Sequence, residues 1–174
     1  RLALAHHDVR VRATRVDHTR EAVQSVAAHV RAGQQVRARP VGDGHVSTTI
    51  RLTLVTDDPS IPSSIIAKVP AEDERSRVLA ASVRSYEREV KFFSELAPTV
   101  DIRMPRCHHA DWDPATNDYV VLLEDMSPAE QGDQLEGCSV DRADLAVREL
   151  ARLHGPRWND PTLSDIDWLS GNEP

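Results

Sequence analysis

The sequence predicts an α+β fold in which five antiparallel strands pack around one long helix. Short segments of alternating or continuous apolar residues are separated by turn formers, which is typical of hairpins. Between the third and fourth of these segments, apolar residues recur at steps of three and four, the spacing of an amphipathic helix. The chain has 174 residues and is 40% apolar, enough to bury one domain-sized core.

An amphipathic helix is predicted in the first part of the chain, in an N-terminal region that we assign to residues 1–34. Thr19 can cap its start and Gly33 can end it. The apolar residues at helical spacing are Val16, Val23, Val26, Ala27 and Val30.

Three strands are predicted next. Val36–Pro40 is followed by a turn, Gly42-Asp43-Gly44-His45, and then by Ile50–Leu54, whose apolar residues alternate with period two. After the loop 57–62, Ser64–Pro70 forms a third, mostly apolar strand. These segments predict an antiparallel three-stranded unit.

The long helix is expected from about Ser76 to Ala97. Two further strands, Cys107–Trp112 and Tyr119–Leu123, are joined by a string of turn formers. Ser139 can then cap a last helix that runs to about residue 154. Beyond that helix the sequence predicts no clear element.

Composition and charge exclude several classes of function. The formal net charge is −7, so we expect no binding to nucleic acid or to an anionic membrane. No apolar run is long enough for a membrane span, and Cys107 and Cys138 are too few and too far apart for a disulfide framework or a zinc site. Adjacent histidines such as His108-His109 cannot point the same way in a strand, so no metal site is expected. These features favour a cytoplasmic protein.

Two charged residues interrupt patterns that predict burial. On a wheel of the long helix, Glu89 falls within the apolar arc, whereas Glu87 falls on the opposite, charged side. Lys68 interrupts the apolar third strand. A carboxylate turned toward a core is costly unless it is paired, and a Lys68–Glu89 ion pair would satisfy both residues. Alternatively, Lys68 lies on a solvent face or an edge strand and Glu89 pairs with an arginine.

These parts occur in the order of a kinase amino-terminal lobe: a glycine-containing hairpin, a lysine on the third strand, a glutamate on the next helix and an apolar strand. The chain closely resembles the aminoglycoside phosphotransferase and choline kinase-like family, in its CHK-kinase-like (ecdysteroid-kinase-like) branch. The resemblance spans about Val36 to Trp158. The segments that carry it are Ala67-Lys68-Val69, residues 86–96 (YEREVKFFSEL), Met104-Pro105-Arg106, Leu122-Leu123-Glu124-Asp125-Met126, Gly132-Asp133-Gln134 and Leu153-His154.

The resemblance implies a protein-kinase-like amino-terminal lobe that binds ATP. Lys68 would hold the α- and β-phosphates, and Glu89 would hold Lys68 in place. Gly42, Gly44 and Ser47 would lie in the phosphate-covering loop, where small residues let backbone N–H groups approach phosphate oxygens. The loop departs from the G-x-G-x-x-G pattern because Ser47 stands at the third glycine position.

The strand that ends at Glu124 resembles the hinge, whose backbone groups would hydrogen-bond adenine. Glu124 and Met126 are the expected backbone partners. This divides the chain into the N-terminal region, a lobe over residues 35–126 that ends at the hinge, and a loop, helix and truncated start of a second lobe over residues 127–174.

Kinases of this type take a catalytic aspartate and a magnesium-binding aspartate from segments after the hinge. The segment His154-Gly155-Pro156-Arg157 lacks such an aspartate, and no histidine precedes Asp165 or Asp167 at the required distance. The resemblance thus implies a fragment without catalytic residues or metal ligands, from a parent that uses Mg²⁺ to transfer phosphoryl from ATP to a hydroxyl of a small molecule. Two alternatives stay open: a non-catalytic nucleotide-binding or protein-interaction module derived from a kinase lobe, and an acidic α+β interaction domain whose Lys68 and Glu89 have no such role.

Overall fold

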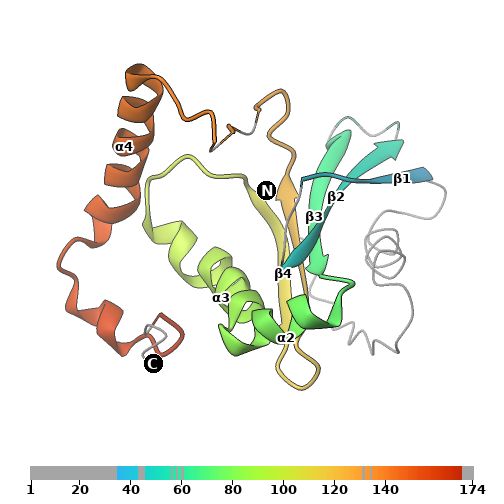
Figure 1. Cartoon of the computed structure of the whole chain (residues 1–174), viewed down its shortest axis with the longest axis horizontal. Coiled ribbons are helices and arrows are strands. Elements are labelled where there is room, and N and C mark those ends of the chain that lie inside the picture. The colour runs from blue at the N-terminus through green and yellow to red at the C-terminus, as the bar shows by residue number, and fades with distance from the viewer. Residues whose placement is uncertain are drawn as a thin grey trace.

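The computed structural model describes residues 35–42, 46–55, 57, 59, 61–130, 132–133 and 135–169. Its architecture is α+β, with one five-stranded antiparallel sheet in the order β1-β2-β3-β5-β4 (Figure 1). The strands are β1 (Gln35–Pro40), β2 (Ser47–Val55), β3 (Ser64–Pro70), β4 (Cys107–Asp113) and β5 (Asp118–Glu124). The predicted fold class is therefore confirmed. The helix predicted in the N-terminal region lies outside the described residues, as does Gly44 in the turn.

The predicted strands agree closely with those of the structure. β3 has the predicted bounds, whereas β2 begins at Ser47 instead of Ile50. The extra residues are polar, and they join the sheet because Ser47 pairs with Pro70 and Thr49 pairs with Lys68. Backbone pairing thus extends β2 beyond the alternating apolar residues from which the strand was predicted.

The two faces of the sheet bury two separate apolar clusters, and the inner strand β5 contributes to both. Leu122 belongs to one cluster, and its neighbours Val121 and Leu123 belong to the other, as expected for alternating side chains in a strand that is covered on both faces. Helix α3 (Ser85–Lys91) covers the second face, which we call the helix face (Figure 1). Lys68 lies opposite Val121 in the register and therefore on this face.

The single long helix predicted from Ser76 to Ala97 is wrong. The segment instead forms α2 (Glu74–Ser82), α3, a π-helical turn η1 (Phe92–Leu96) and a 3₁₀ turn η2 (Ala97–Thr99). The break lies at Arg84, whose backbone is left-handed with φ of 53°. A continuous helix would hold Ala80 and Tyr86 about 120° apart around its axis. The break lets both side chains enter the cluster of the helix face.

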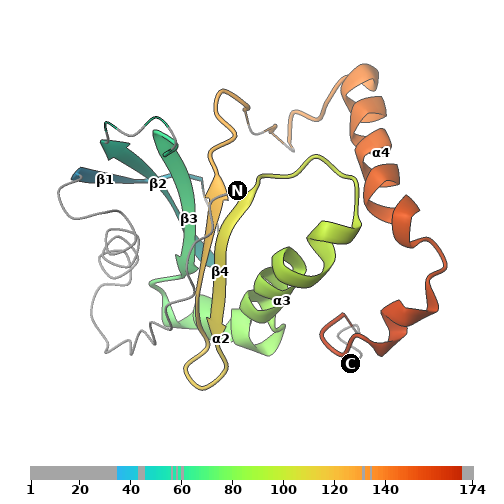
Figure 2. The ribbon, with the colours of Figure 1, turned by 180° about the vertical axis from the view of Figure 1, so that it is seen from behind.

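The predicted last helix is confirmed as α4 (Val140–His154), with the Ser139 hydroxyl accepting a hydrogen bond from the Arg142 N–H. Two short 3₁₀ turns follow, η3 (Gly155–Arg157) and η4 (Pro161–Asp165). Figures 1 and 2 show α3 between the sheet and this C-terminal part of the chain. None of the described helices is both long enough and apolar enough to cross a membrane.

Candidate functional site

Lys68 and Glu89 form an ion pair between β3 and α3. Lys68 Nζ lies 2.5 Å from Glu89 Oε1, and the side chains are 27% and 21% exposed. Lys68 points to the helix face because it alternates with the buried Ala67 and Val69, which face the other cluster. The pair expected from two charged residues in apolar patterns is confirmed.

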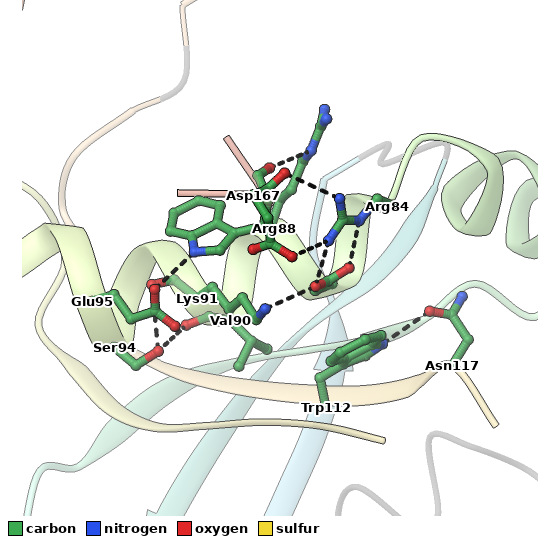
Figure 3. Close-up of polar contacts among 11 residues, drawn as sticks. Arg84, Arg88, Val90, Lys91, Ser94, Glu95, Trp112, Asn117 and Asp167 are labelled. Carbon is green, nitrogen blue, oxygen red and sulfur yellow. Dashed lines mark hydrogen bonds and ion pairs between the residues drawn. The ribbon is translucent and has the colours of Figure 1, made fainter. Parts of the chain in front are cut away.

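On the opposite side of α3, the exposure of Glu87 differs from the exposure that the helical wheel predicts. Glu87, expected among exposed charges, is buried, with only 8% of its side chain accessible. It accepts hydrogen bonds from Arg84 Nε at 2.7 Å and Nη2 at 2.9 Å, and it pairs with Lys91 Nζ at 2.9 Å (Figure 3). The wheel correctly places Arg84, Glu87 and Lys91 on one side of the helix, but it does not predict that Glu87 is buried there.

We call Glu87, Arg84 and Lys91 the Glu87 cluster, in which the charges interact strongly. The Arg84 hydrogen bonds and, to a smaller extent, Lys91 together lower the pKa of Glu87 from 4.5 to about 2, although burial opposes them. Glu87 is therefore ionised at every physiological pH. The Glu87 carboxylate thus pairs with Arg84 at the start of α3 and with Lys91 at its end.

The pH dependence of folding tests this ion-pair cluster. Because the folded pKa of Glu87 lies below its ordinary value of 4.5, its stabilisation is present above pH 4.5 and is lost as the pH falls toward 2. Between about pH 5 and about pH 2.5, the parent chain should lose about 2 kcal/mol more stability than Glu87→Gln, discounted because both partners are partly exposed. Urea unfolding at both pH values measures the difference.

The control is Asp144→Asn, because Asp144 forms an exposed ion pair on α4. This variant should keep the pH dependence of the parent chain. If Glu87→Gln also keeps it, the Glu87 cluster does not contribute to stability.

The predicted phosphate loop is described only at its ends. Gly42 has φ of 75°, a backbone conformation that favours glycine, and a Cβ atom there would meet no other atom within 4 Å. Ser47 is buried at the start of β2. Near it, burial raises the pKa of the Tyr119 phenol, the Glu89 carboxylate raises it further, and the Ser47 hydroxyl lowers it. The role of Ser47 in phosphate binding stays a prediction.

The predicted hinge follows the end of β5. The Glu124 N–H donates to the Arg106 carbonyl at 2.8 Å, and the Met126 carbonyl accepts from the Ala129 N–H at 2.9 Å. Because these two groups already have partners, the predicted hydrogen bonds to adenine would involve the Glu124 carbonyl and the Met126 N–H. The side chain of Glu124 accepts from Arg103 Nη2 at 3.0 Å and from the Arg106 N–H at 2.9 Å.

An open hollow of about 200 Å³ lies at the hinge. Its walls include Arg51 of β2, Ile66 of β3, Leu123 of β5 and the hinge residues 124–127. Ile66 and Lys68 are two residues apart on β3, so their side chains lie on the same face, about 7 Å apart along the strand. The hollow and the Lys68–Glu89 pair are thus neighbours on the helix face.

A family model described as ecdysteroid kinase-like matches residues 41–156, well over half of the chain. The chain belongs to the ecdysteroid kinase-like family. The matched range contains the hollow, the ion pair and all of α4. No curated protein matches the chain.

Membership in the ecdysteroid kinase-like family indicates a kinase-like phosphotransferase, and the sheet and α3 fit a kinase-like amino-terminal lobe. Within the described residues there is no group of three or more His, Cys, Asp or Glu side chains that could hold a metal ion.

Sequence reasoning missed the residue that anchors the hinge of this ecdysteroid kinase-like chain. Asp125 is nearly buried and forms an ion pair with Arg51, whose Nε lies 2.7 Å from Asp125 Oδ2. It accepts hydrogen bonds from Arg51 Nη2 at 3.0 Å, the Ser64 hydroxyl at 2.8 Å and the Ser127 N–H at 3.0 Å. Burial alone would raise the pKa of Asp125, but the hydrogen bonds from Ser127, Arg51 and Ser64 hold it below its usual value. The available signal was Arg51, an arginine among the apolar residues of β2.

Cys107 packs against the apolar cluster of the helix face. Burial raises the pKa of its thiol, and its Sγ donates to the His109 carbonyl at 3.4 Å. A raised pKa disfavours the thiolate, which is the nucleophilic form.

Proposed function

We propose that this chain is the nucleotide-binding part of an ATP-dependent phosphotransferase that acts on a hydroxyl of a small molecule. The observation that carries the proposal is the Lys68–Glu89 pair, which shares the helix face of the sheet with the hollow at the hinge. The pair holds a lysine ammonium in a fixed place, where it can neutralise phosphate oxygens.

In this proposal, adenine occupies the hollow and bonds to the Glu124 carbonyl and the Met126 N–H. The phosphates extend along β3 to Lys68, under the loop that contains Gly42, Gly44 and Ser47. Residues 35–126 form the nucleotide-binding lobe, and residues 127–174 begin a second lobe. Lys68 and Glu89 position the nucleotide and do not take part in bond making or breaking.

We propose that the catalytic aspartate and the magnesium ligands belong to a further part of the second lobe. Two observations support this division. The described residues hold no candidate metal cluster. Helix α4 also exposes apolar side chains that a further layer of protein could cover: Val140, Leu145, Val147 and Leu150. The chain by itself should therefore bind nucleotide without turning it over.

We place this activity in the cytoplasm, where ATP is available. Cys107 and Cys138 are free thiols, in keeping with a reducing compartment. The net charge of −7 supports a small-molecule acceptor over nucleic acid.

Nucleotide titration tests the proposal. Calorimetric titration of the whole chain with MgADP and MgATP should show weak binding. Lys68→Met should weaken it by about tenfold or more, because the phosphates lose their cationic partner. Arg148→Met removes an equal charge from an exposed position on α4 and should leave the affinity unchanged.

Three outcomes would contradict the proposal. Absence of nucleotide binding by the parent chain, or equal binding by Lys68→Met, would favour a protein-interaction module. Phosphorylation of a hydroxyl compound by the chain alone would show that the catalytic residues are already present in it.

A further inference from the structure

The segment 165–169 lies against the side of α3 and η1 that faces away from the sheet. Trp168 is buried to 3% exposure, whereas Trp158, ten residues earlier, is 72% exposed. No element was predicted in this segment, yet it contacts residues more than 70 positions earlier in the chain. We call segment 165–169 the strap.

The strap is held by hydrogen bonds from side chain and backbone. Trp168 Nε1 donates to Glu95 Oε2 at 2.7 Å, and Arg88 Nε donates to the Trp168 carbonyl at 3.0 Å (Figure 3). Arg84 Nη1 donates to the Asp167 carbonyl at 3.3 Å, and Arg84 Nη2 lies 3.7 Å from an Asp167 carboxylate oxygen. The strap thus contacts both ends of the segment 84–95.

The strap and the Glu87 cluster are one unit, because Arg84 belongs to both. The guanidinium of Arg84 pairs with Glu87 on its own helix and with Asp167 on the strap. Glu89 lies on the same two turns of helix but points to the opposite side, toward Lys68. One short helix therefore links the strap to the candidate nucleotide site.

Helix α3 depends on such contacts for its position. It has seven residues and begins at a left-handed arginine with no side-chain cap. A helix this short is marginal without tertiary packing. Tyr86 and Val90 pack toward the sheet, and the strap supplies packing on the outer side.

We propose that Trp168 and the strap are positioning elements for the Lys68–Glu89 pair, so that the C-terminal part of the chain sets nucleotide affinity through α3. Trp168 does not touch the nucleotide in this arrangement. It holds α3 against the sheet, and α3 holds Glu89 within reach of Lys68. The inference rests on the proposed function, because nucleotide affinity is the property that the strap controls.

The test compares Trp168→Ala with the matched control Trp158→Ala in the whole chain, with MgADP as the probe. Trp168→Ala should weaken MgADP binding by about tenfold, and Trp158→Ala should leave it unchanged. In a Glu89→Gln background, Trp168→Ala should cause little further weakening, because the strap acts through Glu89. Equal weakening in both backgrounds would show a general structural role and overturn the proposal.

A second variant covers the case in which Trp168→Ala does not fold. Trp168→Phe keeps an aromatic ring but loses the N–H donor to Glu95, and it should weaken MgADP binding by about threefold. Unchanged affinity in a folded Trp168→Phe chain whose α3 exchanges like the parent would contradict the proposal.

Hydrogen exchange without nucleotide separates failure of the strap from failure of the proposed function. Amides of residues 85–91 should exchange faster in the Trp168 variants than in the parent chain or Trp158→Ala. If these amides respond but the parent chain binds no MgADP, the proposed function is wrong and the strap still positions α3. If they do not respond, the strap does not position α3.

Discussion

Replacing Tyr86 by alanine should destabilise the chain by about 4 kcal/mol, within the range for removal of a buried aromatic side chain. Tyr86 is 1% exposed and stacks on Tyr119 with ring centroids 4.1 Å apart and ring planes 10° apart. Its hydroxyl donates to the Val46 carbonyl at 2.6 Å and accepts from the Ala71 N–H at 3.2 Å. One side chain thus joins α3 to the ends of β2 and β3.

Tyr86→Phe separates the contribution of the hydroxyl to stability from the contribution of the ring. This variant should cost about 1 to 2 kcal/mol, because the Val46 carbonyl and the Ala71 N–H lose a partner at a buried site. Urea unfolding measures both variants, and Leu79→Ala on the exposed side of α2 is the control, with an expected cost below about 0.5 kcal/mol. Equal stability of Tyr86→Phe and the parent chain would show that these hydrogen bonds add nothing.

The sheet could be predicted from sequence because each strand carries its own local signal. In β2, Ile50, Leu52 and Leu54 alternate with polar residues, and the structure buries these three on one face. The Lys68–Glu89 pair could be predicted because each residue broke an apolar pattern and each could satisfy the charge of the other. Both inferences rest on short-range periodicity combined with the cost of burying an unpaired charge.

The helix break at Arg84 could not be predicted in the same way. Left-handed backbone is usually marked by glycine or asparagine, and here an arginine adopts it. The wheel also placed Glu87 on an exposed side. Helical periodicity gives the side of the helix on which Glu87 lies, but it does not show that this side is covered.

The strap and the hinge anchor were missed for a different reason, since both depend on contacts between residues far apart in the chain. Trp168 meets Glu95 across 73 positions, and Arg51 meets Asp125 across 74. No periodic pattern joins such residues. A tryptophan in a segment without predicted structure, and an arginine in an apolar strand, were the only local signs.

Asp125→Ala should destabilise the chain by about 3 kcal/mol, because it removes a nearly buried carboxylate that joins the hinge to two strands. Without it, Arg51 of β2, Ser64 of β3 and the Ser127 N–H lose a shared acceptor. The expected cost stays at the low end for a broken buried pair because Arg51 is partly exposed in the hollow and water can solvate it. Urea unfolding measures the loss.

Asp125→Asn distinguishes the charge from the hydrogen-bond geometry. An amide oxygen can still accept from Ser127 and Ser64, but it gives Arg51 no counter-charge. This variant should therefore recover about half of the stability lost in Asp125→Ala. The exposed Asp144→Ala on α4 is the control, with an expected cost below about 1 kcal/mol. If Asp125→Asn were as unstable as Asp125→Ala, the ion pair with Arg51 alone would hold the hinge; if both were as stable as the control, the hinge would be held by its backbone contacts to Arg106 and Ala129.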